Sequence, residues 1–174
     1  LRARNGLNLF TTTARYGHDM NTRKQFKITY STLGSPDPLL HEYYEDALQM
    51  ARNSLGKTHR MWIGGEWVAS AATYATFSPI DTSLQMGHFQ DGTAADIDRA
   101  VAAARAAYPG WRATPWQERV AVLRRVAERI SERLFEIAAV DSLEVGKNRL
   151  EALGDVEEAA DFIRAYCDAM QEHH

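Results

Sequence analysis

The sequence predicts a mostly helical protein with a small antiparallel group of strands. Three observations support this fold class. Apolar residues recur at helical spacing in several segments, a Gly-Gly pair joins two short strand-like stretches, and capping residues stand where helical segments begin. The 174 residues, 45% hydrophobic and 25% charged, match an ordinary globular protein. No apolar run approaches the roughly 18 residues that a membrane-spanning helix needs.

Residues 1–36 read as a basic N-terminal arm, with six Arg or Lys residues and one acidic residue. Such a start resembles an organelle transit peptide, and the alternative is an extension that drapes over a partner surface. The single cysteine, Cys167, suits a reducing compartment. We expect a cytoplasmic protein, with the mitochondrial matrix as the alternative. The net charge of -3 argues against nucleic acid as a partner.

Residues 37–58 are expected to form a helix. A proline-rich break precedes this segment, and apolar side chains such as Leu40, Tyr44 and Ala51 recur within it at helical spacing. Gly56 stands where the helix should end.

Residues 59–92 are expected to form a β-hairpin and further strands. Two strand-like triplets flank Gly64 and Gly65, and glycine supplies the positive φ that both central positions of a two-residue turn require. Trp62 and Trp67 face each other across this turn, where a cross-strand contact or a core plug is expected. The stretches 73–81 and 84–89 are expected to be extended as well.

Residues 93–174 are expected to be helical, in four segments. Thr93 begins the first segment and has an acid three residues later, close to a capping box, and this segment should end at Pro109. Thr114 is expected to cap the second segment, with Pro115 as its first residue and Gln117 as the reciprocal cap.

Two apolar stripes predict how these later helices pack. The first runs from Val120 to Leu134 through Leu123, Val126, Ala127 and Ile130, with the arginines on the other face. The third segment should stop at Gly146. The last segment carries a seam against a partner helix, formed by Leu153, Val156, Ala160, Ile163, Cys167 and Met170.

Catalytic motifs are absent from the sequence, and we assign no catalytic residue and no cofactor-binding residue. The six histidines have no metal-site spacing. Cys167 lies within the apolar seam and close to acids, whereas a reactive thiolate needs an electropositive, partly exposed setting. We therefore expect it to be a small buried side chain.

Glu158 is the candidate binding residue. On a helical wheel it lies opposite the apolar seam, on a face whose other members are Gly154, Phe162, Ala165 and Ala169. If that face also packs, the carboxylate needs a cationic partner. Glu158 is either an anchor for a ligand ammonium group, or a member of a structural ion pair, or simply an exposed acid.

Six motifs, taken in order along the chain, resemble the N-terminal part of the aldehyde dehydrogenase superfamily. They are WIGGEWV, FSPID, MGHF, the helix pair from AADIDRAV to VAERI, LEVGK and EALGDVEEAADFIRAYCDAM. The resemblance covers about residues 59–172. Ser78 stands in place of the usual Asn and Val145 in place of the usual Thr. The helix before the hairpin and the segment DVEEAADFIRAYCDAM are similar to the Δ1-pyrroline-5-carboxylate dehydrogenase branch.

The resemblance implies an α/β parent fold with a Rossmann-like cofactor domain, of which residues 93–174 would be an incomplete helical part. It implies NAD+- or NADP+-dependent oxidation of glutamate γ-semialdehyde to glutamate. The nucleophilic cysteine, the base, the oxyanion asparagine and the dinucleotide contacts of the family lie downstream of the matched segment. We therefore expect this segment alone to be inactive and to bind no cofactor.

The resemblance also implies three binding residues. Glu158 matches a glutamate near the substrate's amino group, and Thr76 and Glu144 match positions that can hold a structural monovalent cation. The expected partners are the remainder of the same enzyme or a complementary chain, a small aldehyde, and further copies in a homo-oligomer. In this hypothesis the seam of the last helix is covered by the missing sheet or by another chain. The alternative is a non-catalytic helical interaction or assembly module derived from this family.

Overall fold

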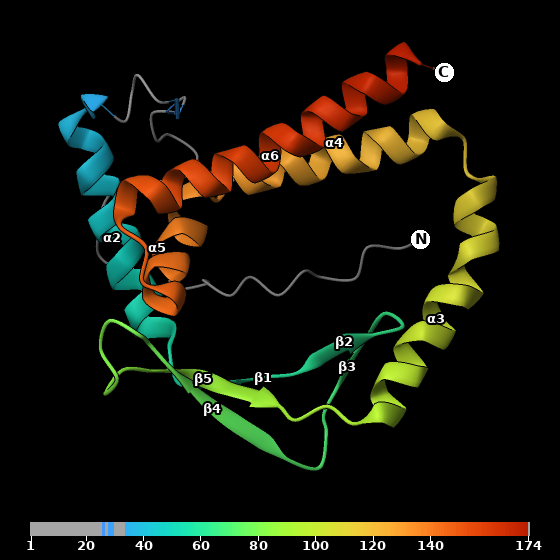
Figure 1. The fold of residues 1–174 in the computed structure, drawn as a ribbon, viewed down its shortest axis with the longest axis horizontal. Coiled ribbons are helices and arrows are strands. Elements are labelled where there is room, and N and C mark those ends of the chain that lie inside the picture. Colours follow the sequence, from blue (N-terminus) through green and yellow to red (C-terminus); the bar gives the residue numbers. More distant parts are fainter. Residues whose placement is uncertain (1–25, 27, 30–33, 174) are drawn as a thin grey trace.

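The structure is a computed structural model, and it describes residues 26, 28–29 and 34–173 (Figure 1). Most of the predicted basic arm lies outside the described residues. The described elements, in chain order, are α2 (Pro38–Ser54), β1 (Lys57–His59), β2 (Met61–Ile63), β3 (Glu66–Val68), β4 (Thr73–Phe77), β5 (Gln85–Gln90), α3 (Ala94–Ala113), α4 (Trp116–Glu132), α5 (Leu134–Val145) and α6 (Arg149–Glu172). The mostly helical prediction is confirmed.

The strands form two small sheets. β2 and β3 make the predicted hairpin, with φ of 62° at Gly64 and 88° at Gly65. The ring centroids of Trp62 and Trp67 lie 4.8 Å apart, which is the cross-strand contact. The core-plug alternative is wrong, because these two side chains are 58% and 52% exposed.

The second sheet has the strand order β1-β5-β4. β4 runs antiparallel to β5, as the sequence predicts, with a register shift between Thr76 and Phe77. β1 runs parallel to β5 and pairs His59 with Phe89. No sequence pattern indicated this parallel strand, since three residues are too few for a period of two to be recognised.

The helix boundaries agree with the capping signals at α3 and depart from them at α4. Thr93 and Asp96 form a complete capping box at the start of α3. The helix does not stop at Pro109 but continues to Ala113, because the proline ring holds φ near the helical value and the helix ends one turn later.

The predicted cap at Thr114 is therefore wrong. Its hydroxyl donates to the carbonyl of Gly110 at 3.0 Å, so it closes α3 instead of opening α4. Pro115 takes the N-cap position of α4 without a side-chain hydrogen bond, and Gln117 makes no reciprocal cap. The end of α5 is as predicted, with Gly146 at φ 81°.

The core lies where α2, α5 and α6 meet, at one end of the molecule (Figure 1). Tyr44 of α2 donates a buried 2.5 Å hydrogen bond to Ser142 of α5. The guanidinium of Arg149, at the start of α6, lies 4.9 Å from the Tyr44 ring centroid. A second cluster joins α2 and α5 to β5 through Met86 and Leu143. These contacts fix α6 relative to the sheet.

α4 and α6 lie side by side along their length (Figure 1). Leu153, Val156, Ala160 and Cys167 of the predicted seam are buried. Their cover is α4 and α5 of the same chain, so the expectation that a missing sheet or another chain covers the seam is wrong. Small side chains in the seam, such as Ala160 and Cys167, allow α4 and α6 to approach closely, so that α4 covers much of the seam.

The predicted stripe on α4 is only partly correct. Val120, Ala127 and Leu134 are buried, but Leu123 and Val126 are 43% and 41% exposed. The arginines are not confined to the opposite face either. Arg124 lies 2.7 Å from Asp168 of α6. The contact strip is narrower than the apolar stripe, so part of the stripe stays on the surface.

Candidate functional site

Glu158 lies on the outer face of α6 and is exposed. Leu153, Ala160 and Cys167, on the opposite side of the helix, are buried against the rest of the chain. This confirms the wheel-based placement of Glu158 opposite the seam. Its face does not pack within the described residues.

Neighbouring acids of α6 are paired with cations. Asp155 forms an ion pair with Lys147. Arg164 lies 3.0 Å from Glu157 and 2.7 Å from Asp161. Within residues 34–173, the Glu158 carboxylate has no ion pair and no hydrogen bond, so the structural ion pair considered for it is not formed there.

Two exposed aromatic side chains follow Glu158 along α6. Phe162 is 56% exposed and Tyr166 is 73% exposed, although both are large aromatic side chains. Gly154 is one turn before Glu158 and contributes no side chain. The Glu158 carboxylate therefore lies on a part of α6 that carries both paired charges and exposed aromatic rings.

The first turn of α6 is held in place by polar contacts. The Asn148 side chain accepts hydrogen bonds from the backbone N–H groups of Leu150 and Glu151, both at 3.1 Å. Lys147, in the connection from α5, reaches forward to Asp155. These contacts hold the first two turns of α6 against the connection from α5.

The two cation candidates lie on either side of one junction. Ser78, two residues after Thr76, donates a buried 2.5 Å hydrogen bond to the carbonyl of Leu143, the neighbour of Glu144. The structure thus brings the end of β4 to the end of α5. The described part of the chain holds no group of three or more His, Cys, Asp or Glu side chains that could hold a metal ion. The cation site stays a prediction.

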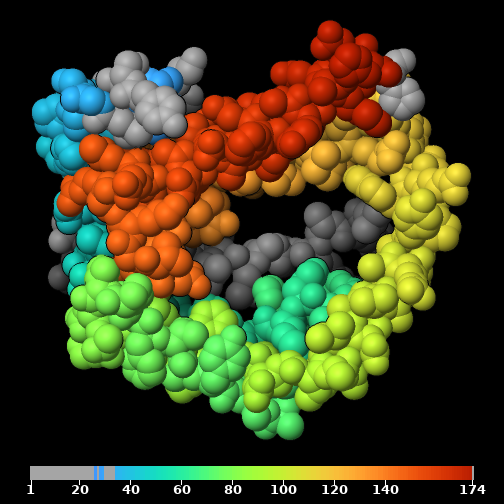
Figure 2. Space-filling model, in the orientation of Figure 1, coloured from blue at the N-terminus to red at the C-terminus, as the bar shows by residue number. Residues whose placement is uncertain are grey.

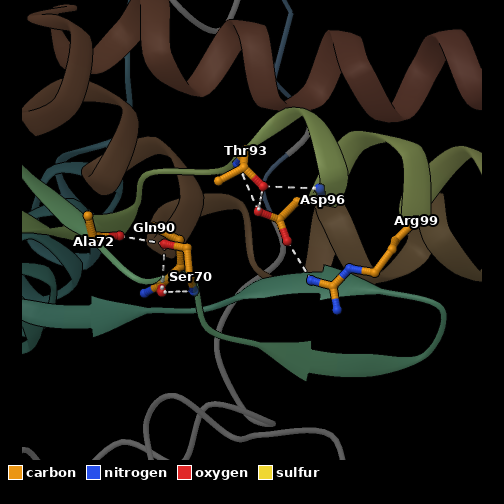
Figure 3. A network of polar contacts seen from close by, with 6 residues as sticks. All are labelled: Ser70, Ala72, Gln90, Thr93, Asp96 and Arg99. Atoms are coloured by element: carbon orange, nitrogen blue, oxygen red, sulfur yellow. Dashed lines mark hydrogen bonds and ion pairs between the residues drawn. The ribbon is translucent and has the colours of Figure 1, made fainter.

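A second polar cluster joins the end of β5 to the start of α3 (Figure 3). Gln90 accepts a 2.8 Å hydrogen bond from the backbone N–H of Ser70 and donates one of 2.8 Å to the carbonyl of His59. Hydrogen bonds from Thr93 and an ion pair with Arg99 lower the pKa of Asp96 from 3.8 to about 2. Since each of these polar groups has a partner, the cluster is structural.

A shallow groove of about 400 Å³ runs along α4 and α5. It is lined by four aliphatic side chains and three arginines, namely Val122, Arg125, Val126, Arg129, Ile130, Arg133 and Ile137. Arg129 and Arg133 already pair with Glu132 and Glu136. None of the three candidate binding residues lines this groove.

The family is decided by comparison with known proteins. The model of the aldehyde dehydrogenase family matches residues 67–174. The chain belongs to the aldehyde dehydrogenase family. Aldehyde dehydrogenases are a family of oxidoreductases, and the resemblance seen in the sequence is confirmed.

The curated relatives include 1-pyrroline-5-carboxylate dehydrogenases and a dehydrogenase of another aldehyde. A 1-pyrroline-5-carboxylate dehydrogenase of Staphylococcus haemolyticus is 35% identical over 131 residues, which are 75% of this chain and 26% of the relative. A fluoroacetaldehyde dehydrogenase of Streptantibioticus cattleyicolor is 39% identical over 121 residues, 68% of this chain and 24% of the relative. The chain spans about a quarter of the length of these curated relatives.

The fold is similar to that of Thermus 1-pyrroline-5-carboxylate dehydrogenase. The R100A mutant of the Thermus thermophilus enzyme superposes with a TM-score of 0.76 at 28% identity, over 91% of this chain and 29% of that one. A Thermus structure with bound NAD gives the same values.

Among the described residues, no helix is both long and apolar enough to cross a membrane.

Proposed function

We propose that this chain is the N-terminal portion of an NAD+- or NADP+-dependent aldehyde dehydrogenase that oxidises glutamate γ-semialdehyde, the open form of 1-pyrroline-5-carboxylate, to glutamate in proline catabolism. Family membership and the names of the relatives support the reaction. The Thermus relative with bound NAD supports the choice of cofactor. Such a cofactor accepts a hydride when it is bound. No step of that chemistry is assigned to the residues described here.

The observation that carries the substrate class is the Glu158 carboxylate, which is unpaired within the part of the chain that the structure describes. Three acids within one turn of it have cationic partners, whereas Glu158 is exposed and unpaired within the described residues. An unpaired carboxylate can bind a cationic ligand through charge-assisted hydrogen bonds, which are stronger than neutral ones. The α-ammonium group of glutamate semialdehyde is such a ligand.

The test uses the full-length enzyme and two substrates. Glu158→Gln should lower kcat/KM for glutamate semialdehyde by about 10- to 150-fold, since a hydrogen bond to a charged group contributes about 1.5–3 kcal/mol. Glutarate semialdehyde, which lacks the amino group, should be oxidised at the wild-type rate. Glu151→Gln removes an exposed acid from the first turn of the same helix and serves as the matched control. Equal losses on both substrates would contradict the anchor.

Catalytic groups are proposed to come from the polypeptide beyond this segment. The chain's one cysteine supports this, because Cys167 is 2% exposed and its sulfur faces the Val120 carbonyl at 3.9 Å. A buried thiol without a neighbouring base is a poor nucleophile. The isolated 174-residue chain should show neither dehydrogenase activity nor NAD binding, measured by NADH absorbance and by calorimetry. Either activity in the isolated chain would contradict this part of the proposal.

Further polypeptide is proposed to cover α3. This helix presents one exposed stripe at heptad spacing, in which Ile97, Val101, Tyr108 and Trp111 are 44–64% exposed. Figure 2 shows α3 set apart from α2, α5 and α6, across an opening in the molecule. A contiguous exposed apolar surface marks a site of interaction with another polypeptide. The occupant is the remainder of the enzyme or a complementary chain, within a homo-oligomer.

The same stripe is the one observation that favours the alternative, a non-catalytic assembly module. The mass of the native protein separates the two. The chain spans about a quarter of its curated relatives, so a native polypeptide about four times this length supports the enzyme, whereas one of about 174 residues supports the module. We propose the cytoplasm as the compartment, with the mitochondrial matrix as the alternative, to be decided by fractionation.

The junction beside Thr76 and Glu144 is proposed to hold a structural monovalent cation. Hydroxyl, carboxylate and carbonyl oxygens are the ligands that hard cations prefer. Thr76→Val and Glu144→Gln should remove any difference in melting temperature between potassium and choline buffers. A wild-type enzyme whose melting temperature is the same in both buffers would contradict the site.

A further inference from the structure

α3 meets the rest of the described chain along one narrow face. Asp96 is buried, and its carboxylate accepts a 2.8 Å hydrogen bond from the Thr93 hydroxyl. Two turns later, the Cβ of Ala103 lies toward the hairpin, 3.5 Å from where a Cβ on Gly64 would stand. Each residue turns a helix by about 100°, so the members of the exposed stripe are rotated by about 80–160° from Ala103. The described residues therefore leave the stripe uncovered.

The stripe has the residue spacing of a seam between two packed helices. Its members follow one another at intervals of four, three, four and three residues, namely Ile97, Val101, Ala104, Tyr108 and Trp111. This alternation is the a/d pattern of supercoiled helices. A seam of this kind is complete only when a second helix supplies side chains that fit between its own.

The order of side-chain sizes along the stripe favours an antiparallel partner that is itself α3. In an antiparallel pair of identical helices, each a position faces a d position, so Val101 meets Ala104 of the second copy. In the same register, Tyr108 meets Ile97 of the second copy, and each larger side chain faces a smaller one. A parallel pair would set the two copies of Trp111 against each other and leave a void between the two copies of Ala104.

Charged side chains on one edge of the stripe complement those of a second copy. Every seventh residue along this edge is charged, acidic toward the start of α3 and basic toward its end: Asp91, Asp98, Arg105 and Arg112. All four are exposed, and within residues 34–173 none forms an ion pair.

Only the antiparallel arrangement pairs these charges. It sets the two copies of the edge side by side, so that Asp98 faces Arg105 of the second copy. Asp91 faces Arg112 of the second copy in the same register. A parallel pair sets the charged edge against the other edge of the stripe, whose residues Thr93, Ala100 and Ala107 carry no charge.

We infer that α3 is a contact surface between two copies of this chain, which pair antiparallel about a two-fold axis. The inference rests on the proposal that further polypeptide covers α3, and it commits that cover to a second copy. A two-fold contact uses the same surface on both copies, which is what a self-complementary stripe provides. The apolar side chains supply most of the affinity, whereas the exposed ion pairs fix the direction of the partner helix.

The first test exchanges charges in the full-length enzyme and measures self-association by analytical ultracentrifugation. Asp98→Arg should raise the Kd between copies about 5- to 100-fold, because two symmetry-related ion pairs become repulsions. Asp98→Arg/Arg105→Asp re-forms both pairs with the signs reversed and should return the Kd to within about threefold of wild type. Glu128→Arg makes the same change of charge at an exposed acid of α4 and should have no effect.

The second test identifies the neighbour of α3 by disulfide cross-linking. Ile97→Cys/Tyr108→Cys should give a covalent dimer on a non-reducing gel, because these positions face each other between antiparallel copies. Each single variant should stay monomeric on that gel, since about 16 Å of helix axis separates position 97 from position 108. A dimer of the Ile97→Cys variant alone would indicate a parallel pair and contradict the inference.

An unchanged Kd for Asp98→Arg, no recovery in the charge exchange, or no cross-link in the double cysteine variant would each overturn the inference. Labelling of Ile97→Cys with a maleimide separates two failures. If the thiol is protected but the copies do not cross-link, another part of the enzyme covers α3 and only the second copy fails. If the thiol reacts freely, the proposed cover of α3 fails as well.

Discussion

Replacing Gly87 with alanine tests the contact between β1 and β5. A methyl group on Gly87 would lie 2.9 Å from the carbonyl oxygen of Lys57 and 3.0 Å from Cδ2 of His59. Gly87 is buried and pairs with Lys57 across the parallel ladder. The His59 ring is itself stacked on Phe89, with centroids 4.9 Å apart. A methyl group therefore has no space unless a strand moves.

Overpacking of this kind costs about 1–3 kcal/mol. The reduced freedom of the unfolded chain on Gly-to-Ala substitution returns about 0.4–1 kcal/mol. The net loss in the free energy of unfolding should be about 1–2 kcal/mol. For a chain of this size that corresponds to a fall in melting temperature of about 2–8 °C, measured by circular dichroism.

Gly110→Ala is the matched control. Gly110 lies inside α3, and a Cβ there would meet no atom within 4 Å. Alanine should raise stability by about 0.5–1 kcal/mol, because glycine is unfavourable in a helix. The double variant Gly87→Ala/His59→Ala should not recover, since the closest contact is with backbone. Full recovery in the double variant, or a Gly87→Ala protein as stable as wild type, would refute the reasoning.

Three further predictions concern hydrogen bonds. Tyr44→Phe leaves the buried Ser142 hydroxyl unpaired and should cost about 1–3 kcal/mol by urea unfolding. Burial raises the pKa of Tyr44 above 10, so its contribution is complete below pH 10 and lost at higher pH, and Tyr44→Phe should flatten that alkaline loss. Thr93→Ala removes the α3 cap and should cost about 1 kcal/mol, whereas Thr114→Ala should cost under about 0.5 kcal/mol in the same assay. The lowered pKa of Asp96 stabilises the fold above pH 3.8 and is lost as the pH falls toward 2, so Asp96→Asn should reduce the loss of stability in acid-titrated melts.

The sequence predicted those elements whose signal is local. Gly64 and Gly65 specify the hairpin because few other residues tolerate positive φ at both turn positions. Thr93 with Asp96 specifies the start of α3 because the two side chains satisfy each other's backbone groups. At Thr114 the same kind of signal was misleading, since the hydroxyl had a carbonyl of the preceding helix within reach.

The ordered motifs also determined the family and placed Glu158 opposite the buried seam, because a helical wheel needs only the 3.6-residue period. Only the tertiary structure decided which partner each face meets. α4 and α5, and not a missing sheet, cover the seam of α6, and β1 pairs in parallel with a strand 30 residues later, Lys57 with Gly87. Within the described residues, Asp155 pairs with Lys147 and Asp161 pairs with Arg164, whereas Glu158 has no partner, and this difference depends on where Lys147 and Arg164 point. Such contacts depend on distances between segments, and spacing along the chain does not contain them.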